Sequence, residues 1–140
     1  MIRSFVVAAV VMLVLDSVWL LAVASPLYRA ELGDRIASPP DLVAGALFYV
    51  VYVGALLWFA VRPGLKDGSA RVAAINGAVL GLAAYATWAL TNRAVLSDWP
   101  WALVPLDVAW GTVLSAVTAA VTTTLSRRWG RTSPPVRPTA

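Results

Sequence analysis

The chain has 140 residues, and neither cysteine nor histidine is among them. Without cysteine there is no disulfide, no thiolate nucleophile and no cysteine-ligated metal. Without histidine the chain lacks the commonest metal ligand and the one side chain that titrates near neutral pH unaided. It also contains no phosphate-binding loop, nucleophile elbow or dinucleotide fingerprint. Most familiar enzyme chemistry is therefore excluded, and we predict neither a metal ion nor a cofactor.

Charged residues are scarce as well. They make up 13% of the chain, against roughly a quarter in a soluble protein. Apolar residues make up 60% and fall into four runs, with nearly all the charges between the runs. Each run is about 20 residues long, which is enough for a helix to cross a bilayer. The chain is therefore predicted to be a single all-α domain, a bundle of four transmembrane helices.

Helix-capping residues, prolines and glycines indicate where the four spans begin and end. By these signals Asp41 caps the second span and Arg62-Pro63-Gly64 ends it. Gly68-Ser69 precedes the third span, and Asp98 caps the fourth. The predicted spans are residues 2–24, 42–61, 72–91 and 102–125, in a membrane domain over residues 1–125.

The first apolar run has a second interpretation. Arg3, the run itself and Ala22-Val23-Ala24 resemble a signal peptide with a small-residue cleavage site. The run is longer than the roughly 7–15 residues of such a peptide, and it contains Asp16. Both differences favour a retained membrane span.

Basic residues are distributed unevenly between the two ends of the predicted bundle. Four spans place both termini on one side, which collects eight of them, whereas the opposite side has three. The positive-inside rule then predicts cytoplasmic N and C termini. Charge at membrane flanks does not predict nucleic-acid binding. The eight are Arg3, Arg62, Lys66, Arg71, Arg127, Arg128, Arg131 and Arg137, and the three are Arg29, Arg35 and Arg93.

Residues 126–140 follow the last span and are rich in Arg, Pro, Ser and Thr. Such a segment has too few apolar residues to bury a core. It is predicted to be a disordered basic tail on the cytoplasmic side.

Two aspartates, Asp16 and Asp107, lie inside apolar spans. An aspartate at the middle of a membrane helix costs roughly 2.5–3.5 kcal/mol on insertion scales, so neither is expected to face lipid. Asp16 is predicted roughly 12 Å and Asp107 roughly 8 Å below the outer ends of their spans. Both should therefore face the inside of the bundle, at similar depth in the outer half of the membrane.

Both aspartates belong to the same short pattern, Asp-x-x-Trp. A residue three positions on shares the face of a helix, so Trp19 should lie beside Asp16, and Trp110 beside Asp107. Pro105 cannot bond the carbonyl of Trp101 and is expected to kink the fourth span beside Asp107.

The second and third spans place polar aromatic residues at the same level. Tyr49 and Tyr52 lie on one face of the second span, and the third carries Tyr85, Trp88 and Asn92 on one face. Together with the aspartate motifs they form a predicted ligand-binding cluster. Its members are Asp16, Trp19, Tyr49, Tyr52, Tyr85, Trp88, Asn92, Asp107 and Trp110.

Each part of this cluster also has a purely structural interpretation. Tryptophans near membrane surfaces are commonly interfacial, and we interpret Trp99 and Trp101 in this way. The stripe of small residues at Gly77 and Gly81 suits close helix packing. For the aspartates the alternative is a hydrogen bond between helices, such as Asp16 accepting from a tyrosine.

Four motifs in the chain resemble a family of small bacterial membrane proteins, domain of unknown function 2177. The resemblance covers the chain to about Thr122 and implies a four-helix protein of the bacterial cytoplasmic (inner) membrane, without an activity to carry over. The motifs are Leu15-Asp16-Ser17-Val18-Trp19-Leu20, Phe48-Tyr49 with Tyr52 and Gly54, Tyr85-Ala86-Thr87 with Leu90-Thr91-Asn92, and Asp107-Val108-Ala109-Trp110-Gly111.

The chain departs from the family pattern at one place. After Thr87 the family pattern continues Tyr-Asp, whereas this chain has Trp88-Ala89. A third acid would favour a metal site, because hard cations take several oxygen ligands. Its absence agrees with the prediction that no metal is bound.

Three functions remain open from the sequence. The first is a pocket for a small amphipathic or lipid-like molecule, which is either only bound or processed with Asp16 or Asp107 as acid or base. The second is a proton-coupled transporter, by analogy with the small multidrug-resistance exporters. It would act as a homo-oligomer, although its acids lie away from the midplane where coupling sites are common. The third is a subunit whose polar stripe docks a partner helix.

Overall fold

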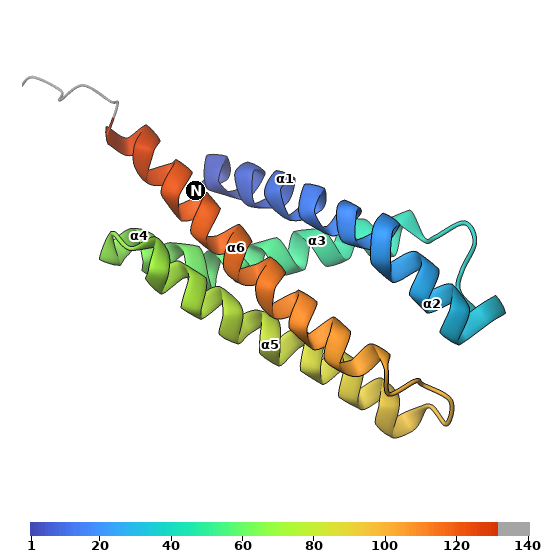
Figure 1. Ribbon diagram of the computed structural model, residues 1–140. Helices are drawn as coiled ribbons and strands as arrows, with labels where there is room; N and C mark the ends of the chain where they lie inside the picture. The colour runs from blue at the N-terminus through green and yellow to red at the C-terminus, as the bar shows by residue number, and fades with distance from the viewer. Residues whose placement is uncertain (132–140) are drawn as a thin grey trace, which may run out of the picture.

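The computed structural model describes residues 1–131, and in them the chain forms four long helical segments that run back and forth (Figure 1). The first segment passes from α1 through a π-helical turn into α2, and the second passes from α3 through another such turn into α4. The elements are α1 (Ile2–Trp19), a π-helical turn (Leu20–Ala24), α2 (Ser25–Leu32), a 3₁₀ turn (Gly33–Arg35), α3 (Leu42–Leu56), a π-helical turn (Leu57–Val61), α4 (Arg62–Asp67), α5 (Ala70–Val95) and α6 (Leu103–Arg131).

All four segments are long and apolar enough to cross a membrane, which confirms the predicted all-α four-helix architecture. The start of α1 and the end of α6 lie at one end of the bundle (Figure 1). We call the part next to this end the terminal half. The part next to the connections at residues 36–41 and 96–102 is called the loop half. Which end faces the cytoplasm stays a prediction.

All four segments run further than the predicted spans, α5 with Ala70–Val95 against residues 72–91. The first continues to Arg35, the second continues to Asp67, and α6 continues to Arg131. The first six residues of the predicted tail are thus helical. Residues 132–140, the rest of that tail, lie outside the described part of the chain.

Both π-helical turns stand directly before a proline. In the first, the backbone N–H of Ser25 bonds the carbonyl of Leu20, and Pro26 follows. In the second, the N–H of Arg62 bonds the carbonyl of Leu57, and Pro63 follows. A proline ring clashes with the carbonyl four residues earlier, and a wider turn makes room for it. A π-helical turn therefore accommodates Pro63, and the second segment does not end there as predicted.

Two of the predicted caps are present. The Asp41 carboxylate accepts from the backbone N–H groups of Val43 and Ala44 at 2.9 and 3.0 Å, and the Ser69 hydroxyl accepts from the N–H of Val72 at 3.3 Å. Both pairs satisfy N–H groups that a helix start leaves unbonded. Asp98 instead forms an ion pair with Arg35.

Pro105 was expected to kink the fourth span, but α6 begins only at Leu103, so no turn of helix precedes the proline. Pro105 is the third residue of that helix, where a backbone N–H has no partner within the helix in any case.

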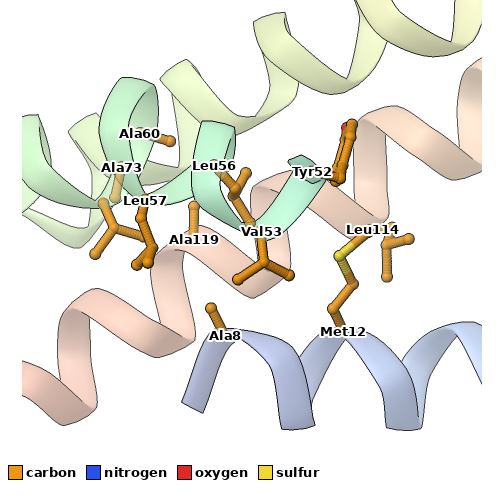
Figure 2. Packing of buried hydrophobic residues seen from close by; sticks show 11 residues of the cluster. Ala8, Met12, Tyr52, Val53, Leu56, Leu57, Ala60, Ala73, Leu114 and Ala119 are labelled. Carbon is orange, nitrogen blue, oxygen red and sulfur yellow. The ribbon is translucent and has the colours of Figure 1, made fainter. Parts of the chain in front are cut away.

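The core of the terminal half is built from small and aliphatic side chains of all four segments (Figure 2). On α1 the buried residues are Ser4, Ala8, Met12 and Asp16, one stripe with a spacing of four. A Cβ added at Gly81 would lie 2.2 Å from the carbonyl oxygen of Gly111. The predicted small-residue seam thus brings the backbones of α5 and α6 into close contact.

Candidate ligand-binding site

A cavity of about 350 Å³ lies in the loop half, between the first helical segment and helices α5 and α6. Its walls include both intramembrane aspartates and residues from the end of α1 to the connection before α3. Six members of the predicted cluster line it, namely Asp16, Trp19, Tyr85, Trp88, Asp107 and Trp110.

Asp16 is buried and accepts hydrogen bonds from two other segments. The Tyr49 hydroxyl on α3 donates to Asp16 Oδ2 at 2.8 Å, and the Trp110 indole Nε1 on α6 donates to Asp16 Oδ1 at 3.1 Å. The side chain is only 8% exposed. The polar group is therefore satisfied between helices, as a buried acid requires.

The two Asp-x-x-Trp motifs pair with each other. Asp16 takes its indole donor from Trp110 of the second motif. Its own neighbour Trp19 stacks on the Trp110 ring, with centroids 4.6 Å apart and planes at 6°. This offset pair joins α1 to α6 at the wall of the cavity.

Asp107 is bonded by a residue that the sequence analysis did not select. The Tyr28 hydroxyl on α2 donates to Asp107 Oδ2, and Tyr28 also lines the cavity. Tyr28 lies beyond the predicted end of the first span, so its side chain was not considered for an intramembrane cluster. The first helical segment continues beyond residue 24, through Pro26, to Arg35.

The remaining three predicted residues, Tyr49, Tyr52 and Asn92, do not line the cavity. The Tyr49 hydroxyl donates to Asp16, which does line the cavity. Tyr52 shares a hydrogen bond with the Ser115 hydroxyl at 2.7 Å, within the terminal-half core. The Asn92 amide nitrogen is buried without a hydrogen-bond partner among the described residues.

An apolar groove of about 310 Å³ adjoins the cavity. Tyr85 and Trp88 line both spaces. The other walls of the groove are Phe48 and Tyr52 from α3, and Ala84 from α5. The cavity and the groove thus share two aromatic side chains in their walls.

The two tryptophans interpreted as interfacial differ from each other. Trp101 is 62% exposed, and the Arg93 guanidinium lies 5.3 Å from its ring centroid. Trp99 is only 9% exposed, and its ring meets those of Tyr28 and Trp88 edge to face. The interfacial interpretation of Trp99 is therefore wrong, because the arm formed by α2 covers it.

A family model described as a predicted membrane protein of unknown function, DUF2177, matches residues 1–124. The chain belongs to this family. The membership confirms the resemblance drawn from the four motifs, and it adds no activity. No curated protein and no solved structure matches the chain.

Three of the four motifs noted in the sequence meet in the loop half. The motif of α1 supplies Asp16 and Trp19, the motif of α5 supplies Tyr85, and the motif of α6 supplies Asp107 and Trp110. Within residues 1–131 no three acidic side chains come close enough together to hold a metal ion. The side chains that line the cavity offer hydrogen bonding, charge and aromatic contact.

Proposed function

We propose that this multi-pass membrane protein binds a small amphipathic, lipid-like molecule in the loop-half cavity. The single observation that carries the proposal is that a cavity lined by two carboxylates shares Tyr85 and Trp88 with a neighbouring apolar groove. An amphipathic molecule has the same two parts. Its polar end would occupy the cavity, and its chain would follow the groove.

The composition of the walls supports this assignment. Ligand sites are mostly apolar and aromatic, with a few convergent polar groups, and have volumes of about 300–1,000 Å³. The cavity combines Trp19, Tyr85, Trp88 and Trp110 with two carboxylates, at about 350 Å³. Buried carboxylates within a membrane commonly mark functional sites.

Native mass spectrometry with lipid extraction tests the proposal on the wild type and the Asp16→Asn/Asp107→Asn variant. We expect one specific molecule to stay bound to the wild type and to be lost from the folded variant. Asp67→Asn, an exposed carboxylate on α4, is the matched control and should retain the molecule. Identical bound lipids in all three proteins, with a lower melting temperature for the double variant, would make the aspartates structural.

A second variant tests the groove, and with it the apolar part of the ligand, separately from the cavity. Ala84→Phe adds a ring to the wall of the groove and leaves the polar cavity untouched. We expect the bound molecule to disappear or to be replaced by one with a shorter chain. An unchanged chain length would contradict the role assigned to the groove.

A further inference from the structure

The charged groups at the cavity are arranged asymmetrically. Asp16 and Asp107 are buried, with exposed fractions of 8% and 7%. Arg29, the only basic residue among the described lining, is exposed on α2. A ligand that enters the cavity therefore meets carboxylates inside and a guanidinium at the rim.

Both carboxylates keep acceptor capacity for a ligand. A carboxylate has about four lone-pair positions. Asp16 uses two of them, for Tyr49 and Trp110, and Asp107 uses one for the hydroxyl of Tyr28. The free positions can accept hydrogen bonds from a ligand group that only donates them.

The aromatic walls favour the same kind of group. A cation is attracted to the face of a tryptophan or tyrosine ring, most strongly where water is excluded. Trp19 and Trp110, which stack on each other, line the cavity together with Tyr85 and Trp88. An anionic group would meet two carboxylates here, and a neutral hydroxyl would gain little from the rings.

We infer that the polar end of the ligand is an ammonium group, held between Asp16, Asp107 and the aromatic walls. This inference rests on the proposed function, since it names the ligand class of the same cavity. Two sources share the chemistry, the head group of an amine-bearing phospholipid and a free long-chain amine. Arg29 distinguishes them, because a phospholipid would also present a phosphate at the rim.

The test is a competition among probes with one chain length and different head groups. Purified protein is incubated with equimolar dodecylamine, dodecyl phosphate and monolauroylglycerol, and native mass spectrometry reads the occupancy of each. We expect dodecylamine to exceed both others by about tenfold, as cation–aromatic contact away from water implies. Asp16→Asn and Asp107→Asn should each reduce that preference. Asp67→Asn changes the net charge equally and should preserve it.

The outcomes separate the inference from the function on which it rests. If the phosphate or the glyceride competes equally with the amine, and Ala84→Phe still reduces binding, the cavity binds amphiphiles but the ammonium assignment is wrong. If none of the three probes binds the wild type, the proposed function fails as well. The head-group ratio of the wild type decides this even if an aspartate variant does not fold.

The source of the ammonium is decided by one added probe, lauroyl lysophosphatidylethanolamine. Occupancy above that of dodecylamine, lost in Arg29→Gln, supports the inference with a phospholipid head group as the source. Occupancy at or below that of dodecylamine supports it with a free amine as the source. A preference for either amine probe that survives in both aspartate variants would overturn the inference.

Discussion

The terminal half and the loop half of the bundle are made from the same four segments, yet they pack differently. In the terminal half, small residues allow backbones to touch, as at Gly77, where an added Cβ would lie 2.5 Å from the carbonyl oxygen of Ser115. In the loop half, the same helices carry Trp88 and Trp110, and a cavity lies between the segments. Residue size along α5 and α6 thus decides where these two helices touch closely and where a cavity fits beside them.

Polar groups are also used differently in the two halves. In the terminal half, hydroxyls pair with each other, as in Tyr52 with Ser115 and in Ser4 with Ser126 at 2.9 Å. In the loop half, carboxylates accept from Tyr49, Trp110 and Tyr28, and the same carboxylates line the cavity. The hydroxyl pairs join helices, whereas the two carboxylates also line the cavity and retain acceptor capacity for a further donor.

The largest effect is expected from a substitution at the close contact between α5 and α6. Gly81→Ala places a Cβ against the backbone of α6, which cannot move as a side chain can. Overpacking of this kind costs about 3 kcal/mol, measured as the free energy of unfolding in mixed micelles with increasing sodium dodecyl sulfate. Gly45→Ala is the matched control, because nothing lies within 4 Å of its added Cβ. Equal stability of the two variants would show that the seam is not closely packed.

A smaller effect is expected from loosening the arm over the cavity. Tyr28→Phe removes the hydroxyl that donates from α2 to Asp107, and hydrogen bonds between membrane helices average about 0.6 kcal/mol. Since the chain has no cysteine, spin labels at Ala30→Cys and Ala102→Cys report the distance between α2 and the start of α6. We expect that distance distribution to broaden.

The corresponding change in the solid half is the control for this variant. Tyr52→Phe also removes one hydroxyl, from the pair with Ser115, and should leave the distance distribution unchanged. Broadening in both variants would mean that the two halves open together, and would contradict the difference in packing between them.

The smallest effect is expected from pH at the loop end. The hydrogen bond from Arg35, with a second from Ser97, lowers the pKa of Asp98 from 3.8 to about 2. A carboxyl with a lowered pKa in the folded state stabilises that state above its ordinary pKa and loses this contribution as the pH falls towards the lowered value. The labelled distance should therefore broaden slightly between about pH 5 and pH 2, because exposed ion pairs contribute little.

Asp98→Asn provides the reference for this titration. Without the carboxylate the ion pair with Arg35 is absent at every pH, so the distribution should not change further upon acidification. An identical pH response in the variant would assign the change to other acids.

Much of the architecture could be predicted because a bilayer imposes it. Backbone groups in lipid must be bonded within a helix or a closed barrel, so four apolar runs become four helices whatever their contacts. The same constraint singled out Asp16 and Asp107, since an acid in an apolar run must face inward. Caps such as Asp41 are local and were also predictable.

The predictions were wrong or incomplete where contacts between segments overrode a local sequence signal. Pro63 reads as a stop, yet a π-helical turn carries the helix past it. The first segment continues beyond its predicted end at residue 24, and this continuation brings Tyr28 to the cavity. Trp99 reads as interfacial, yet the α2 arm covers it. In each case the outcome depends on residues that neighbour in space and not in sequence.

Four membrane spans, the family and the burial of two acids could be inferred from the order of residues alone. These follow from hydropathy and from short motifs, both of which are properties of single segments. The folded arrangement was needed to show that Asp16 takes its indole donor from Trp110, that Tyr28 bonds Asp107, and that Asn92 stays outside the wall of the cavity. Those pairings depend on helix rotation, tilt and the widened turns, which are set by packing between segments.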